Sequence, residues 1–187
     1  QYIMRTNLKH YTRIGSHTII FVIVLALLSC TVDIPDTDTT PPQFSFRITG
    51  DGFDRTFDQN TDFHSFQFNL REDAEYEFIL TGSDAGGVKE ISWLYPHDNI
   101  EFVDPISSPW TTTRLSGLSS QIRWQGDSSN AITGNILTGR FKPNGELVSF
   151  NFDFGVKDFG GQSGTVNSFF ASLNIYSGNH NTEIRTY

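Results

Sequence analysis

Apolar and polar residues alternate along most of the chain after residue 42. The clearest run is 148–154, in which a valine and three phenylalanines alternate with serine, asparagine and aspartate. Alternation with a period of two places the apolar side chains on one face of a half-buried antiparallel strand. Runs of the same kind predict strands at 44–48, 66–70, 76–80, 91–95 and 169–175, and weaker patterns predict strands near 100–103, 122–124 and 136–141.

Turn-forming residues separate the predicted strands. Segments rich in Gly, Asn, Asp and Pro lie at 50–52, 83–87, 143–145 and 158–161. Because Pro143-Asn144-Gly145 lies between two strand-like runs, we expect residues 136–141 and 147–154 to form a hairpin. Many short strands, with no helical pattern after residue 30, predict an all-β domain that is either a sandwich or a barrel.

The first 30 residues have a different pattern. Three basic residues precede an apolar run of ten residues at 19–28, and Ser29 and Cys30 follow at once. A basic region, a short apolar run and a small residue at the cleavage point are typical of a secretory signal. A membrane-spanning helix needs about 20 apolar residues. The pattern therefore predicts a cleaved signal peptide at residues 1–29 rather than a permanent anchor.

Residues 27–30, Leu-Leu-Ser-Cys, resemble the lipobox of bacterial lipoproteins. The resemblance implies that the thiol of Cys30 receives a diacylglyceryl group, with palmitate-type chains, and becomes the first residue of the mature protein. Leu28 is bulkier than the residue usual at its place, and the alternative is an ordinary signal peptide followed by an incidental cysteine. The resemblance implies a bacterial cell envelope location. We favour the outer membrane, on its periplasmic face or at the surface.

Composition adds two constraints. Cys30 is the only cysteine, so an intramolecular disulfide is impossible and the fold must depend on core packing, for which 17 phenylalanines are available. Removal of residues 1–29 leaves 10 basic residues against 21 acidic ones, a net charge of −11. So acidic a domain does not favour nucleic acid. Residues 30–42, rich in Asp, Thr and Pro, are interpreted as the lipidated cysteine and a flexible tether, and 43–187 as one domain.

Three segments, in their order along the chain, resemble bacterial Ig-like domains of cell-surface proteins: 38–42 (Asp-Thr-Thr-Pro-Pro), 83–88 (Ser-Asp-Ala-Gly-Gly-Val) and 156–161 (Val-Lys-Asp-Phe-Gly-Gly). The resemblance implies an antiparallel Ig-like β-sandwich. In that fold 76–80 would be strand B, 88–95 strand C, 148–157 strand F and 167–176 strand G. Residues 96–147 are longer than the usual stretch between C and F. A lipocalin-like β-barrel is the alternative fold.

The Ig-like arrangement predicts a cluster of acidic residues. The start of the first strand, the B–C loop and the F–G loop would lie at one pole, which would face the membrane because the tether enters there. Asp36, Asp38, Asp84 and Asp158 would meet at this pole, and carboxylate oxygens are the ligands that Ca²⁺ prefers. The alternative is that each aspartate only caps its own turn.

Trp110 is a candidate ligand-binding residue. It lies between serines and threonines in 107–113 and is expected to be the most exposed of the three tryptophans. An exposed aromatic ring beside hydroxyl groups could bind a glycan. The alternative is a ring packed beneath its own loop. Trp93 and Trp124 alternate with apolar residues and are expected in the core.

No coherent catalytic set is visible in the sequence. The three histidines after residue 30 are far apart and have no zinc-site spacing. We therefore predict a non-catalytic, membrane-anchored envelope lipoprotein whose Ig-like domain is a binding or spacer module for a glycan or an envelope protein. Two alternatives stay open. One is a carbohydrate-active hydrolase with an unrecognised carboxylate pair, and the other is a barrel that carries a small apolar ligand.

Overall fold

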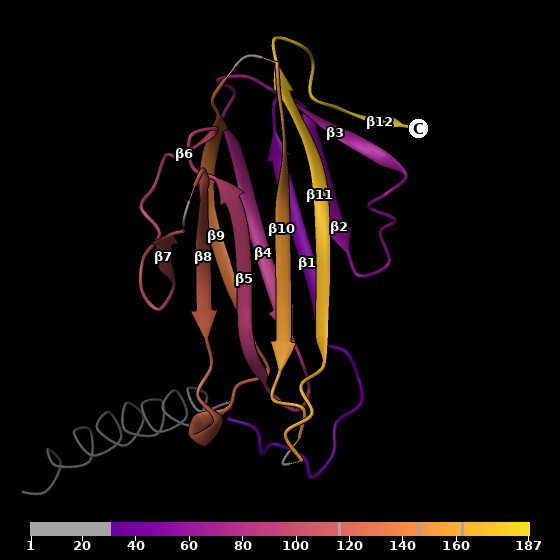
Figure 1. The fold of residues 1–187 in the computed structure, drawn as a ribbon, viewed down its shortest axis with the longest axis vertical. Helices are drawn as coiled ribbons and strands as arrows, with labels where there is room; N and C mark the ends of the chain where they lie inside the picture. Colours follow the sequence, from indigo (N-terminus) through magenta and orange to yellow (C-terminus); the bar gives the residue numbers. More distant parts are fainter. Residues whose placement is uncertain (1–30, 116, 146, 162) are drawn as a thin grey trace, which may run out of the picture. The chain divides into compact units, whose positions relative to one another are not determined.

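The computed structural model describes residues 31–187 except residues 116, 146 and 162. The predicted signal peptide and Cys30 lie outside the described residues. Strands β1 to β12 form two sheets (Figure 1). One has the order β2–β1–β4–β9–β6, with bounds Phe53–Asp58, Gln43–Gly50, Tyr76–Ser83, Gly134–Pro143 and Ile100–Phe102. The other has the order β12–β3–β11–β10–β5–β8–β7, with bounds Glu183–Thr186, Phe66–Arg71, Ser168–Gly178, Val148–Asp158, Val88–Pro96, Ser119–Gln125 and Thr111–Arg114.

The domain is an all-β sandwich. Its two sheets are separate and do not close into one, so the lipocalin-like barrel considered as an alternative is wrong. The hypothesis of a barrel that carries an apolar ligand loses its structural basis for the same reason. All strand pairs are antiparallel except β3 with β11, which is parallel. Among the described residues the only helix is the 3-10 turn Ser128–Asn130. This part of the chain therefore has no helix that is long and apolar enough to span a membrane.

The strand order matches the immunoglobulin-like arrangement. The sequence β1–β4–β9–β6 corresponds to A–B–E–D, and β11–β10–β5 corresponds to G–F–C. The ranges predicted for B, C, F and G fall on β4, β5, β10 and β11. The long stretch between C and F supplies β6 and β9 to one sheet and β7 and β8 to the other, so its extra length widens the second sheet.

The predicted hairpin around Pro143-Asn144-Gly145 is wrong. Strand β9 pairs with β4 and β6 in one sheet, whereas β10 pairs with β5 and β11 in the other. The turn therefore carries the chain from one sheet to the other. Turn-forming residues predict that the chain reverses direction, but they do not predict whether the next strand belongs to the same sheet.

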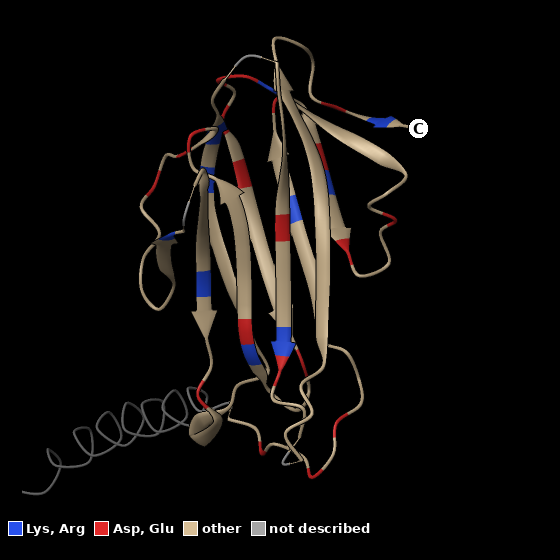
Figure 2. Cartoon of the chain, viewed as in Figure 1, with Lys and Arg blue, Asp and Glu red and all other residues tan. Residues whose placement is uncertain are grey.

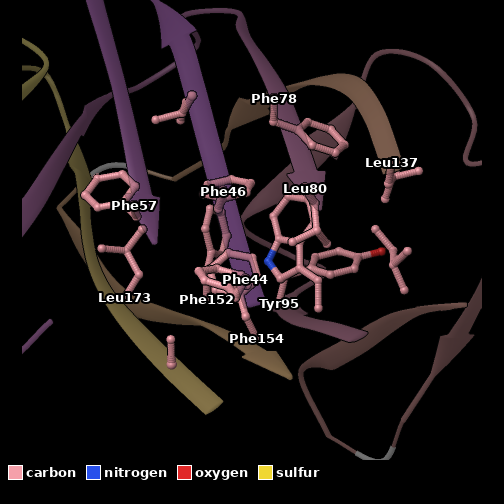
Figure 3. Close-up of a cluster of buried hydrophobic side chains, with 14 of the residues drawn as sticks. Phe44, Phe46, Phe57, Phe78, Leu80, Tyr95, Leu137, Phe152, Phe154 and Leu173 are labelled. Atoms are coloured by element: carbon pink, nitrogen blue, oxygen red, sulfur yellow. The ribbon is translucent and has the colours of Figure 1, made fainter. Parts of the chain in front are cut away.

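Aromatic rings fill the space between the sheets (Figure 3). Trp93 on β5 is fully buried, and its ring centroid lies 5.4 Å from that of Phe46 on β1, 5.0 Å from Phe78 on β4 and 4.9 Å from Phe152 on β10. Tilted and edge-to-face pairs at these separations are favourable beyond the area that they bury. One aromatic cluster therefore joins the two sheets without a disulfide.

Lys, Arg, Asp and Glu residues occur along the strands and on the connecting segments (Figure 2), and nearly all of the described ones are at least partly exposed. Several form exposed ion pairs, such as Arg47 with Asp54 and Arg140 with Asp104. Exposed pairs of this kind contribute little stability. Among the described charged residues, only Asp84 and Asp158 are buried. These two aspartates lie at the same pole of the sandwich and are the starting point for the candidate site.

Candidate functional site

Three of the four predicted aspartates meet at one pole of the sandwich. Asp38 precedes β1, Asp84 follows β4 and Asp158 ends β10. One carboxylate oxygen from each lies within 4.8 Å of the others. Asp158 is fully buried and Asp84 is 8% exposed, while Asp38 is partly exposed. The convergence of these segments, which the Ig-like resemblance implies, is present in the structure.

Each carboxylate is held by hydrogen bonds from nearby backbone. The Asp84 Oδ1 atom accepts from the N–H of Gly86 at 2.8 Å, and the Asp38 Oδ1 atom accepts from the N–H of Thr40 at 2.9 Å. Both oxygens of Asp158 accept from Asn167, one from its backbone N–H and one from its side-chain amide, each at 2.7 Å. Asp38 and Asp84 therefore cap their own turns, which was the alternative to a metal site, whereas Asp158 accepts from a residue on the far side of the loop that follows β10.

Asn167 joins the parts of the site, and it is not among the residues predicted from the sequence. Its Nδ2 atom donates to the carbonyl oxygen of Asp38 at 3.0 Å as well as to Asp158. One amide therefore links the segment before β1 to the end of β10. No motif marks this asparagine in the sequence, because its role depends on two residues that are remote from each other along the chain.

Asp36 does not join the other three. Its side chain is exposed, and it is the backbone carbonyl oxygen that accepts a hydrogen bond from the N–H of Ser163, at 3.3 Å. The carbonyl group of Asp36 therefore faces the β10–β11 loop, and its exposed carboxylate is not part of the cluster. Asp36 serves below as a control residue at the same pole.

The electrostatics of the cluster are unfavourable without a cation or a shared proton. Burial raises the pKa of Asp84, and the neighbouring carboxylates of Asp38 and Asp158 raise it further, against a lowering contribution from the Gly86 N–H. Among the described residues, none of the ion pairs involves these three aspartates. Ca²⁺ binding therefore stays a prediction that fits the donor chemistry, since a hard cation is bound by clustered carboxylate oxygens.

A shallow hollow of about 310 Å³ adjoins the cluster. Polar side chains of Asp38, Thr40, Gln43, Ser83, Asp84 and Thr133 line it together with the apolar Pro41 and Ala85. A second hollow, also of about 310 Å³, shares Gln43 and Ser83 with the first and continues over β1, β2 and β4. Hydroxyl, amide and carboxylate groups are therefore available in both hollows, among apolar surface in the first.

Trp110 is not exposed, contrary to our expectation. It is 6% exposed and belongs to the hydrophobic core, and its backbone N–H donates to the carbonyl oxygen of Ser107. Its burial within the core cluster agrees with the alternative interpretation, a packed ring. The serines and threonines around it make the local sequence polar, and a polar local sequence does not show whether the ring between them is buried. Trp93 and Trp124 are buried, as predicted.

We expect Asp84→Asn to raise stability in EDTA at pH 7. The raised pKa means that ionised Asp84 destabilises the folded state, so the mutation removes a penalty while keeping an oxygen for the Gly86 N–H. For the wild type in EDTA, the same penalty should decrease as the pH falls through the raised pKa towards the unfolded value. If Ca²⁺ binds, it should stabilise the wild type by about 2.7 kcal/mol at 100 times Kd.

Thermal melts in EDTA and in CaCl₂ measure both effects, with Asp36→Asn as the control at the same pole. The control should keep the Ca²⁺ response of the wild type, whereas Asp84→Asn should lose it. Identical melting temperatures of the wild type in EDTA and Ca²⁺ would reject the metal site. A destabilised Asp84→Asn protein in EDTA would contradict the expected penalty, because the asparagine oxygen keeps the hydrogen bond from the Gly86 N–H and only the charge is lost.

The chain was compared with protein families, curated proteins and solved structures. No protein-family model and no curated protein matches the chain. Among solved structures, it is similar to a cohesin module from Clostridium perfringens ATCC13124 family 33 glycoside hydrolase, with a TM-score of 0.35 and 9% sequence identity over 61% of this chain and 97% of that one. The class that the fold defines, an all-β sandwich of immunoglobulin-like strand order, rests on the two sheets described above.

Proposed function

We propose that the chain is a lipoprotein of the bacterial cell envelope, held to a membrane through lipid on Cys30, whose β-sandwich binds a partner without catalysis. The observation that carries the anchor is Leu27-Leu28-Ser29-Cys30 directly after a basic region and an apolar run of ten residues. The observation that supports a binding role is a sandwich with a filled aromatic core and a hollow at one pole that offers hydroxyl, amide and carboxylate groups. We further propose the outer membrane as the location.

The two adjoining hollows are the proposed ligand-binding surface. Their side chains are mainly hydroxyls, amides and carboxylates, which can donate hydrogen bonds to and accept them from the hydroxyls of a glycan. Backbone and side-chain groups of an envelope protein would find the same partners. Gln43 and Ser83 belong to both hollows, so Gln43→Ala is expected to weaken binding to either ligand class.

A second candidate function is a glycan hydrolase. Asp38 and Asp84 place carboxylate oxygens within 4.8 Å of each other beside a hollow, and the pKa of Asp84 is raised, mainly by burial. A retaining glycosidase needs two carboxyl groups about 5–5.5 Å apart, one of them with a raised pKa. Release of nitrophenol from a panel of nitrophenyl glycosides, lost in Asp84→Asn, would favour the hydrolase. No release would favour the binding module.

The anchor is tested by growing cells that express the full chain with an alkyne analogue of palmitate. Click coupling to a fluorophore should label the mature protein. The diacylglyceryl group on the Cys30 thiol has two acyl chains, and the alkyne analogue is incorporated into them. A mature protein of the size expected for cleavage before Cys30 that carries no label would contradict the proposal. Crosslinking of the same cells, followed by purification, then identifies the glycan or protein partner.

A further inference from the structure

The backbone of residues 32–38 is hydrogen-bonded to the loops of the membrane-anchored pole, by two backbone groups and one side-chain amide. The N–H of Val32 donates to the carbonyl oxygen of Ala131 at 2.9 Å, just after the 3-10 turn between β8 and β9. The carbonyl oxygens of Asp36 and Asp38 accept from Ser163 and Asn167 in the β10–β11 loop. In the structure this part of the predicted tether therefore lies against the domain (Figure 1).

Two glycines make this close contact possible. A Cβ atom added at Gly86 would lie 2.7 Å from the Asp38 Oδ2 atom and 2.9 Å from the Pro35 Cδ atom. A Cβ atom at Gly161 would lie 2.9 Å from the Asp38 nitrogen, the Pro35 carbonyl oxygen and the Thr37 Cα atom. Side chains at these positions would push the segment away. Because these two positions have no side chain, residues 32–38 can pack directly on the β4–β5 and β10–β11 loops.

Chain length then limits how far the domain can stand from its anchor. Val32 is the second residue after Cys30, and a fully extended chain spans at most about 3.6 Å per residue. The lipidated residue is therefore within about 7 Å of a residue that is hydrogen-bonded to the domain. A free tether over residues 30–42, as the sequence suggested, would instead allow the domain to move over tens of ångströms.

We infer that the domain has no free spacer and that this pole rests directly on the phospholipid headgroups of its membrane, an inference that depends on the lipid anchor proposed above. The connecting segments 31–42, 84–87, 126–133 and 159–167 contain no Lys or Arg, and they carry several aspartates. Figure 2 shows acidic residues on the connections at this pole. An acidic surface is repelled by anionic lipid, so the partner is a zwitterionic headgroup surface such as phosphatidylethanolamine.

Fluorescence quenching of the lipidated protein in vesicles tests this orientation. Because the lipid occupies the only natural cysteine, an introduced cysteine can be labelled alone. Ser128→Cys lies in the 3-10 turn at the anchored pole, and Asn179→Cys follows β11 at the opposite pole; both native side chains are exposed. Strand β11 has 11 residues, which separates the poles by roughly 30–35 Å. Vesicles of phosphatidylcholine and phosphatidylethanolamine with a headgroup spin label should quench the dye at position 128 and not at position 179.

A matched pair of glycine variants tests the packing of residues 32–38 on the β10–β11 loop. Gly161 and Gly164 have similar backbone angles, with φ of +73° and +77°, but a Cβ atom at Gly164 would meet nothing within 4 Å. Gly161→Ala should release the segment and reduce quenching at position 128, whereas Gly164→Ala should preserve it. Equal quenching at both poles of vesicle-bound protein would overturn the inference and leave the anchor intact. Protein that does not float with the vesicles would overturn the anchor and, with it, the inference.

Discussion

Cys30→Ala is expected to move the protein from the membrane fraction to the soluble fraction of the cell envelope. One acyl chain gives only marginal membrane binding, whereas two chains give a stable anchor. The proposed diacylglyceryl group supplies two, and the substitution removes both. No helix in the described part of the chain could replace them as a membrane span. Ultracentrifugation of lysates, followed by immunoblotting of pellet and supernatant, measures the effect.

The control must separate loss of lipid from failure of signal cleavage. A precursor that keeps residues 1–29 could stay at the membrane through its apolar run, so the size of the Cys30→Ala protein has to be checked. A second version replaces residues 1–29 with an ordinary cleavable export signal and keeps alanine at position 30. If this cleaved version still sediments with the membranes, the lipid anchor is not what holds the protein there.

Trp93→Ala is expected to lower the free energy of unfolding by about 3–5 kcal/mol. The side chain is fully buried, and its ring packs against aromatic residues of β1, β4 and β10. Its removal therefore leaves a cavity between the two sheets and removes contacts to both of them. Domains of this size are stable by only about 5–15 kcal/mol. Urea denaturation followed by circular dichroism measures the loss.

Trp93→Phe keeps the protein testable if the alanine variant does not fold. Phenylalanine fills most of the volume, and it removes an indole N–H that has no hydrogen-bond partner among the described residues. Its cost should therefore be clearly below that of alanine. Phe170→Ala is the surface control, because Phe170 is 68% exposed and its loss should change stability by at most about 0.5 kcal/mol. Similar costs for Trp93→Ala and Phe170→Ala would contradict the core described here.

The central strands and the edge strand β6 could be predicted from the sequence, whereas the edge strands β2, β7 and β12 could not. Strands β1, β4, β5, β10 and β11 each have one buried and one wet face, and this difference produces the alternation of apolar and polar residues. Strand β7 is four exposed residues, Thr-Thr-Thr-Arg, at the edge of the larger sheet. Strands β2 and β12 are also edges with few buried positions. A strand that is wet on both faces has no period-two signal.

The candidate site was predictable only as far as loop order determines it. Asp38, Asp84 and Asp158 meet because the strands that they flank end at one pole, and that follows from an Ig-like arrangement. Asp36 was misassigned because its side chain is exposed and stays outside the cluster although Asp38 is only two residues away, and spacing along the chain does not reveal this. The contact of residues 32–38 with Gly86 and Gly161 was not predicted. Proline and aspartate in a segment indicate that it is solvated, and they do not show that glycines elsewhere in the fold leave room for it to pack.

The aspartate cluster joins the beginning of the domain to parts that are made late. Asp38 can meet Asp158 and Asn167 only after β10 and the loop that follows it have been synthesised, and β3 finds its partners only in β11 and β12. Pairings between residues so distant in sequence form slowly. Under the lipid anchor proposed above, Cys30 would have to be modified before residues 32–38 are paired with these late parts. Folding of the sandwich would then end the period in which the segment beside Cys30 is unpaired.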